Sequence, residues 1–166
     1  MSRNADYWIE RFNMLPHPEG GYFKEVYRSR EFVQREHLPE RYDGERNFVT
    51  SIYFLLDKTQ TSKFHRLKSD EIWYHLDGNG ALVHIIYPDG KRNTIKLGYD
   101  YDKGEHLQAV IPMGSWFGAE VTDKAGYCLV GCAVAPGFNF NDFELAKREN
   151  LLNEFPDYAD IINKLT

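Results

Sequence analysis

The stretch FHRLKSDEIWYHLDG, residues 64–78, largely alternates apolar and polar side chains on both sides of a short polar break at Lys68 to Asp70. Alternation with a period of two is typical of β-strands, so we expect a β-hairpin that turns at this break. In such a hairpin Leu67 lies opposite Glu71, and His65 and Glu71 become diagonal neighbours about 7 Å apart on one face. The stretch therefore predicts two paired strands on which a histidine and a carboxylate converge.

The centre of the chain repeats this pattern of strand and turn. Short runs rich in Gly, Asp, Asn and Pro separate the strand-like segments, and Asp89-Gly90 is the clearest hairpin signal among them. Such spacing is typical of an all-β barrel or sandwich. We expect strands at residues 21–29, 48–56, 62–67, 70–76, 81–88, 91–98, 107–112, 115–121 and 126–136.

Both ends of the chain are predicted to be helical. Residues 4–15 place apolar side chains at helical spacing after a capping candidate, Asn4, and the helix is expected to stop before Pro16. Residues 142–165 return to that spacing, with Asp142 as a capping candidate and a break at Pro156. The packing face of this second helical region is expected to consist of Ile161, Ile162 and Leu165.

A length of 166 residues suits one compact domain, which we place over residues 1–166. The barrel core is expected at about 20–140, with the C-terminal helices at about 142–165. Residues 30–47 carry both signs of charge without a sustained period, so we interpret them as an exposed excursion.

The composition excludes several classes of function. The 20 Lys and Arg residues are interspersed among 25 Asp and Glu, for a net charge of −5, which argues against a nucleic-acid partner. No segment approaches the roughly 20 apolar residues that span a bilayer, and no signal core is visible, so we expect a cytoplasmic protein without a membrane partner. Cys128 and Cys132 lie about 13 Å apart if their segment is a strand, too far for a disulfide, and are interpreted as small buried residues.

The opening stretch resembles the first motif of the cupin superfamily, in which two histidines, a glutamate and a glycine recur at fixed spacing. His65, Leu67, Glu71 and Gly78 stand at those four positions, so leucine replaces the second histidine. The second cupin motif is similar to PMGSWF, where Phe117 stands in the place of the ligand histidine.

Four longer blocks resemble a small cupin family of unassigned function. They are LPHPEGGYFKEVYRS at residues 15–29, SIYFLL at 51–56, FHRLKSDEIWYH at 64–75 and LVGCAVAPGFNFNDFEL at 129–145. The resemblance implies a jelly-roll barrel, also called a double-stranded β-helix, with short helices at both ends. It also implies a homodimer.

The metal site of a cupin is incomplete in this sequence. A catalytic metal normally needs three protein ligands and an open position, and here His65 and Glu71 are the two that remain. The candidates for a third ligand from elsewhere are His84, Tyr53, His17 and His106, and no spacing indicates which. We therefore expect no metal and no other cofactor, and keep a metal-dependent oxygenase or isomerase as a further alternative.

A metal-free site would use His65 as a general base, with Glu71 fixing its tautomer. Metal-free cupin epimerases that act on nucleotide-linked keto-sugars carry a histidine at this position, and one of their early strands is similar to GGYFKE. That resemblance implies ligand contacts for Phe23 and Glu25, although Gly20 stands where those enzymes carry an arginine.

Several aromatic residues are expected to line a pocket for a small ligand, because a barrel mouth commonly holds one. Tyr53 is the candidate acid or hydrogen-bond donor, since a phenol in an apolar strand needs a partner. Residues 135–145 are expected to pack the C-terminal helices onto the barrel rather than to form a binding loop. The candidate lining residues are Phe23, Tyr53, Trp73, Trp116 and Phe117, although all of these also suit a jelly-roll core.

The sequence thus predicts a cupin that carries out metal-independent isomerase-like or epimerase-like chemistry on a small polar ligand, for example a carbohydrate. The alternative is a non-catalytic module that binds a small, sugar-like molecule. Whether the chain turns over a substrate stays open at this stage.

A homodimer is expected in solution, because open sheet edges favour pairing with a second copy. Sedimentation velocity at micromolar concentration should give the mass of two chains. A monomer under those conditions would contradict the expectation.

Overall fold

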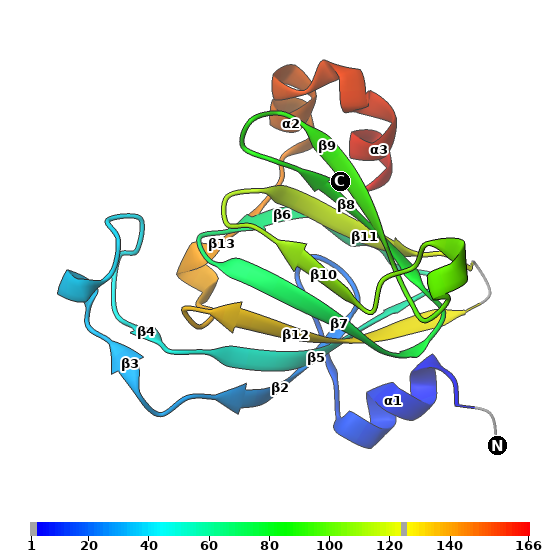
Figure 1. Cartoon of the computed structure of the whole chain (residues 1–166), viewed down its shortest axis with the longest axis horizontal. Coiled ribbons are helices and arrows are strands. Elements are labelled where there is room, and N and C mark those ends of the chain that lie inside the picture. The colour runs from blue at the N-terminus through cyan, green and yellow to red at the C-terminus, as the bar shows by residue number, and fades with distance from the viewer. Residues whose placement is uncertain (1–2, 124–125) are drawn as a thin grey trace.

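Two antiparallel sheets form the body of the protein. The computed structural model describes residues 3–123 and 126–166, and Figure 1 shows their arrangement. The larger sheet has six strands in the order β1-β2-β5-β12-β7-β10, and the smaller has five in the order β13-β6-β11-β8-β9. The strands are β1 Leu15–Pro16, β2 Tyr22–Arg28, β3 Phe32–Val33, β4 Arg46–Asn47, β5 Thr50–Asp57, β6 Ser62–Leu67, β7 Asp70–Gly78, β8 Ala81–Ile86, β9 Arg92–Leu97, β10 Gln108–Ile111, β11 Trp116–Val121, β12 Tyr127–Ala135 and β13 Phe143–Leu145.

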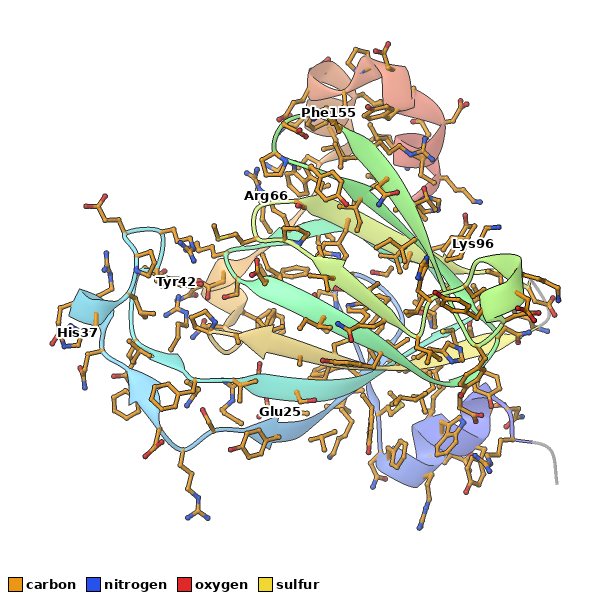
Figure 2. The ribbon with its side chains drawn as sticks, in the orientation of Figure 1. Glu25, His37, Tyr42, Arg66, Lys96 and Phe155 are labelled. Carbon is orange, nitrogen blue, oxygen red and sulfur yellow. The ribbon has the colours of Figure 1, made fainter. Side chains whose placement is uncertain are left out.

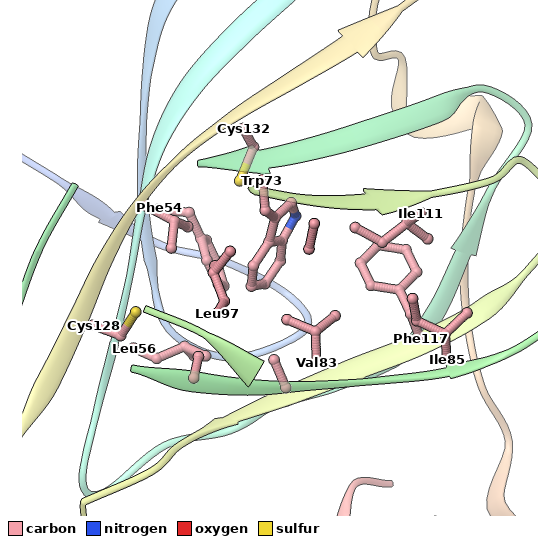
Figure 3. Close-up of a cluster of buried hydrophobic side chains, with 14 of the residues drawn as sticks. Phe54, Leu56, Trp73, Val83, Ile85, Leu97, Ile111, Phe117, Cys128 and Cys132 are labelled. Atoms are coloured by element: carbon pink, nitrogen blue, oxygen red, sulfur yellow. The ribbon is translucent and has the colours of Figure 1, made fainter. Parts of the chain in front are cut away.

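The main core lies between the two sheets. Phe54 and Trp73 project from the larger sheet, and Val83, Ile85 and Phe117 project from the smaller one into the same cluster (Figure 3). Each strand sends alternate side chains inward, as the period-two pattern predicts. The jelly-roll interpretation and the expected strands from residue 21 to residue 136 are confirmed. The Asp89-Gly90 hairpin joins β8 to β9, with Gly90 at a φ of 82°.

The hairpin expected between β6 and β7 is wrong. These strands belong to different sheets: Leu67 pairs with Phe143, whereas Glu71 pairs with Ile111 and Val134. The Lys68–Ser69 connection therefore turns a corner of the barrel. His65 and Glu71 face each other from opposite sheets instead of lying diagonally on one.

Long-range contacts hold this corner in place. The backbone N–H of Lys68 donates to the carbonyl of Asp142, and its carbonyl accepts from Arg41 and from the hydroxyl of Tyr42. That hydroxyl also lies 2.9 Å from the hydroxyl of Ser69. These partners are distant in sequence, so the local pattern could not report them.

Helices cover parts of both sheets. Helix α1, Ala5–Phe12, begins where the Asn4 side chain accepts from the N–H of Tyr7, as expected, and packs on the outer side of the larger sheet. Helices α2, Arg148–Glu154, and α3, Ala159–Lys164, pack against the smaller sheet. The break at Pro156 is confirmed, as is the buried face of Ile161, Ile162 and Leu165. No helix in the described part of the chain is long and apolar enough to cross a membrane.

The excursion at residues 30–47 is mostly exposed, as expected, but it carries two buried anchors. It contains the short β3–β4 pair and extends away from the barrel at the left of Figure 1. Tyr42 is 1% exposed and lies near the corner (Figure 2), and Arg46 is 3% exposed. Asp142 is not a helix cap: its carboxylate accepts two bonds of 2.6 Å from Arg46, because this segment folds as a 3₁₀ turn beside the corner.

Replacement of Asp142 by Asn should strongly destabilise the fold, because it removes the buried one of the two carboxylates that pair with the Arg46 guanidinium and leaves only the half-exposed Asp43. The expected loss is about 3 kcal/mol in the free energy of unfolding. Urea denaturation measures it. Glu144→Gln is the matched control, since Glu144 is paired with Arg66 at the surface and should cost less than about 1 kcal/mol. Equal losses in the two variants would contradict the assigned role of the buried pair.

Candidate functional site

A cavity of about 310 Å³ opens between the two sheets. Its wall is mostly apolar, with one group of ionisable side chains inside and another pair nearer to solvent. The aromatic lining residues are Phe23, Phe54, Trp73, Phe138, Phe140 and Phe143. The ionisable lining residues are His17, Glu19, Glu25, Arg28, His65, Glu71 and Cys132.

Glu19 is the centre of the inner ionisable group. Its carboxylate lies 3.1 Å from Nε2 of His65 and 3.2 Å from Nδ1 of His17, and it accepts a 2.8 Å bond from the hydroxyl of Ser62. A tight turn presents Glu19 to the cavity. In this turn Gly20 has a φ of 105°, and a Cβ there would lie 2.2 Å from a backbone oxygen, so only glycine fits.

Glu19 is ionised at neutral pH. Burial acts to raise its pKa, but the charge of His65 and the hydrogen bonds from His17 and Ser62 outweigh burial and lower the pKa. An ionised carboxylate is a hydrogen-bond acceptor only. The facing imidazole nitrogens must therefore donate to it.

His65 is held by oxygens on both sides. Its Nδ1 lies 2.7 Å from the carbonyl of Lys63, which can only accept, and its Nε2 faces Glu19. Burial lowers the pKa of His65, while Glu19 and the Lys63 carbonyl oppose that shift. The net effect lowers the pKa. Both ring nitrogens face protein oxygens, so neither nitrogen of His65 is free to reach a ligand.

His17 is bonded on one side only. The 3.2 Å contact of its Nδ1 with the Glu19 carboxylate is shorter than the 3.5 Å contact with the Glu19 backbone N–H, so we place the proton on Nδ1. Its Nε2 then carries a lone pair, and no hydrogen-bond partner for Nε2 occurs among the described residues. Four phenylalanine rings surround the imidazole at centroid distances of 5.0 to 6.1 Å: Phe23, Phe54, Phe140 and Phe143.

Glu71 is neutral at pH 7, in contrast to the ionised Glu19. Burial, with a further contribution from the charge of Glu19, raises its pKa to about 8, although Trp73 and Cys132 act to lower it. Glu71 is therefore protonated at neutral pH and has a proton to give. The buried indole N–H of Trp73 is directed to the Glu71 carboxyl.

The structure gathers five of the predicted site residues around the cavity and leaves three outside it. His65, Glu71, Phe23, Glu25 and Trp73 line it. Tyr53 lies on the outer side of the larger sheet, stacked on Phe12 at 4.5 Å, because its neighbours Ile52 and Phe54 point inward. Trp116 packs in the cluster beneath the C-terminal helices. Phe117 is a core residue whose ring lies 4.0 Å from that of His65.

The sequence patterns did not indicate two contacts inside the cavity. Glu19, not Glu71, contacts His65, and His17 shares the same carboxylate. The available signal was the block PHPEGG, whose glycine pair marks a tight turn. Residues 135–145 were expected to pack the C-terminal helices onto the barrel and not to contribute to binding, and this is wrong. Phe138, Phe140 and Phe143 line the cavity, and β13 pairs with β6.

The cavity does not offer the ligand set of a cupin metal centre. Leu67 and Phe117 occupy two of the four ligand positions that the resemblance implies, and neither has a donor atom. Both ring nitrogens of His65 already bond to protein oxygens. Within the described ranges, no three His, Cys, Asp or Glu side chains are arranged to hold a metal ion. These residues therefore do not fit such a metal.

Comparisons with known proteins support the fold and the family. A family model described as Cupin superfamily (DUF985) matches residues 6–146. The uncharacterised protein YML079W of Saccharomyces cerevisiae is 33% identical over 153 residues, which cover 87% of this chain and 76% of that protein. The structure of protein SO0799 from Shewanella oneidensis is 38% identical with a TM-score of 0.89, covering 99% of this chain and 98% of that one. A hypothetical protein from Leishmania major is 34% identical with a TM-score of 0.89 and covers 99% of both chains.

Replacement of Glu71 by Gln should remove a pH dependence of stability. The pKa of Glu71 is raised from 4.5 to about 8 on folding, so the folded state retains a proton that the unfolded chain loses. Between these values the wild-type free energy of unfolding should fall with rising pH by up to about 1.4 kcal/mol per pH unit through this group. The Gln variant should therefore gain stability over wild type as pH rises from 5 to 8.

Urea denaturation at pH 5, 6.5 and 8 measures this difference. Glu25→Gln is the control, because Glu25 is half-exposed and should show no such trend. A constant difference between wild type and Glu71→Gln across the three pH values would show that Glu71 is ionised in the folded protein.

Proposed function

Since the chain belongs to the family described as Cupin superfamily (DUF985), we propose that its barrel cavity carries out metal-independent proton transfer on a small carbonyl compound, as an isomerase or epimerase does. The observation that carries the proposal is the Glu19 carboxylate, which lies 3.2 Å from His17 and 3.1 Å from His65 inside an aromatic cavity. A protonated carboxyl, Glu71, lines the same cavity.

The base in this proposal is His17. Its Nε2 lone pair removes a proton from the carbon next to the ligand carbonyl, and Glu19 stabilises the imidazolium that forms because it accepts from Nδ1. His65, bonded to the other side, fixes the position of that carboxylate. His65 thus stays in the proton-handling group that the sequence predicts, but as a positioning residue.

The acid is Glu71. As the C–H bond breaks and the N–H bond of His17 forms, the carbonyl oxygen gains negative charge and takes the proton of Glu71, which gives an enol. Transfer of the proton from His17 to the opposite face of the same carbon, after the enol has turned over in the cavity, gives the epimer. As the carbonyl re-forms, the enol hydroxyl returns its proton to Glu71. Two carboxyl groups with pKa values moved apart by their surroundings are what such a division of roles requires.

The second candidate function is binding of a small molecule without turnover. The predominance of aromatic and aliphatic lining favours it, since such walls bury a ligand without chemistry. Both functions predict binding in the cavity. They differ in whether a carbon-bound hydrogen exchanges with solvent.

Hydrogen exchange in D₂O tests the proposal. A panel of small keto acids and keto sugars is incubated with the protein, and NMR follows loss of the signal of the hydrogen next to the carbonyl. At least one compound should exchange faster with protein than without it. His17→Gln should slow this by about 10² to 10⁴, and Glu71→Gln by at least about tenfold. His106→Gln, an exposed histidine, is the matched control and should exchange at the wild-type rate.

The pH dependence of the exchange rate tests the role of Glu71 as the acid. Exchange should decline above about pH 8 in wild type as Glu71 loses its proton, and this limb should be missing in Glu71→Gln. Binding with no exchange for any compound in the panel would support the binding module. Exchange at the wild-type rate in His17→Gln, together with loss of exchange in His65→Asn, would show that His65 is the base.

A further inference from the structure

The outer part of the cavity contains an arginine whose position depends on an irregularity in β2. Phe23, Glu25 and Arg28 pair with Phe54, Ile52 and Thr50 of β5, and all six residues line the cavity. In a regular strand, residues three apart point to opposite faces. The register shifts between Glu25 and Tyr27, so a β-bulge brings Glu25 and Arg28 to the same side.

The guanidinium of Arg28 is fixed in orientation by three partners. Its Nη1 donates to the side chain of Asn47 at 2.9 Å and to the carbonyl of Phe138 at 3.1 Å. Its Nε and Nη2 donate to the two carboxylate oxygens of Glu25 at 3.1 and 2.8 Å. The side of the guanidinium that faces Glu25 is therefore shaped for a bidentate carboxylate.

Glu25 is a replaceable partner for Arg28. The side chains of Arg28 and Glu25 are 39% and 45% exposed, and a pair in such contact with water contributes little stability. Glu25 lies beyond the short pairing of β2 with β1, where β2 forms the edge of the larger sheet (Figure 2). A ligand could carry its carboxylate on an apolar group, the ligand body, that fills the aromatic cavity. Such a ligand would bind Arg28 more favourably than Glu25 does, because burial of the apolar group adds to the same bidentate contact.

The remainder of the cavity suits an apolar ligand body better than a sugar. Thr50 accepts from the N–H of Phe138, and Asn139 accepts from the N–H of Asn141, so these two polar side chains are already bonded. Among the described lining residues, Arg28 is the only lysine or arginine. A polyhydroxylated ring would leave many hydroxyl groups unpaired against phenylalanine.

We propose that Arg28 is the anion-binding residue of the cavity and that the ligand is a small aromatic or similarly apolar monocarboxylate, whose carboxylate replaces Glu25 on the guanidinium. The proposal deepens the proposed function and rests on it for the reaction, but not for binding. Phe23 lies 5.0 Å from His17 between ring centroids, and Glu25 is two residues, about 7 Å, further along β2. A ligand whose carboxylate is bound by Arg28 thus extends along this strand towards His17.

Three stable probes with one phenyl body test the proposal by isothermal titration calorimetry. They are 3-phenylpropanoate, its uncharged isostere 3-phenylpropanamide, and 2-phenylethylphosphonate. The wild-type protein should bind the propanoate at least tenfold more tightly than the amide. Tighter binding of the phosphonate than of the propanoate would overturn the choice of a carboxylate in favour of a phosphate-like group.

Two variants with opposite expected effects separate recognition from structure. Arg28→Gln should weaken the propanoate at least tenfold and leave the amide within twofold of wild type. Glu25→Gln should bind the propanoate at least threefold more tightly, because the competing carboxylate is gone. A purely structural role for the pair predicts that both variants weaken both probes, and that result would overturn the proposal, as would no binding of the propanoate at 10 mM.

The outcomes also separate this proposal from the proposed reaction. Binding that follows the predicted order, with no hydrogen exchange for any keto acid, would leave the anion site in place and exclude the proton-transfer function. Exchange that is unchanged in Arg28→Gln, together with equal affinity for the propanoate and the amide, would leave the reaction in place and exclude the anion site.

Discussion

The cavity depends on one buried carboxylate, that of Glu19. It joins the turn before β2 to the start of β6 through Ser62 and His65, and it holds His17 from the other side. A buried carboxylate without donors would carry a large desolvation penalty. Glu19 therefore depends on all three donor side chains, those of Ser62, His65 and His17. The glycine turn at residues 20 and 21 is what brings the carboxylate to this place.

The same arrangement explains why two glutamates in one cavity have different charge states. Glu19 gains three donors and stays ionised, whereas Glu71 lies among apolar side chains and close to the charge of Glu19. The negative charge of one carboxylate makes ionisation of the other less favourable. Of these two carboxyl groups, Glu19 therefore keeps its charge and Glu71 keeps its proton. This division is the physical basis of the base and acid roles that we propose, and a filled apolar core would not need it.

Much of the fold could be predicted from the sequence because strand alternation and turn residues are local signals. Strands β2 and β5 to β12, the Asn4 cap and the Ile161–Ile162 packing face all follow from such signals, whereas β13 lies in a segment that was predicted to be helical. The hairpin at Lys68 could not be judged in this way, because contacts from Tyr42 and Asp142 decide that the chain changes sheets there.

The site was predicted less completely for the same reason. His65 and Glu71 were found through the spacing of a motif, and both line the cavity. Tyr53 was misplaced because an apolar run does not reveal which face of a strand points inward. Glu19 and His17 lie more than forty residues before His65 and meet it only in the folded barrel, so no local pattern connects them.

The tautomers of the two histidines provide the most direct test of the central claim, that Glu19 organises the cavity. In ¹⁵N-labelled protein, imidazole NMR signals should show a proton on the nitrogen of each histidine that faces Glu19, Nε2 of His65 and Nδ1 of His17, and Glu19→Gln should change both patterns. A neutral His17 protonated on Nε2, or imidazole signals that are the same in wild type and Glu19→Gln, would contradict the account.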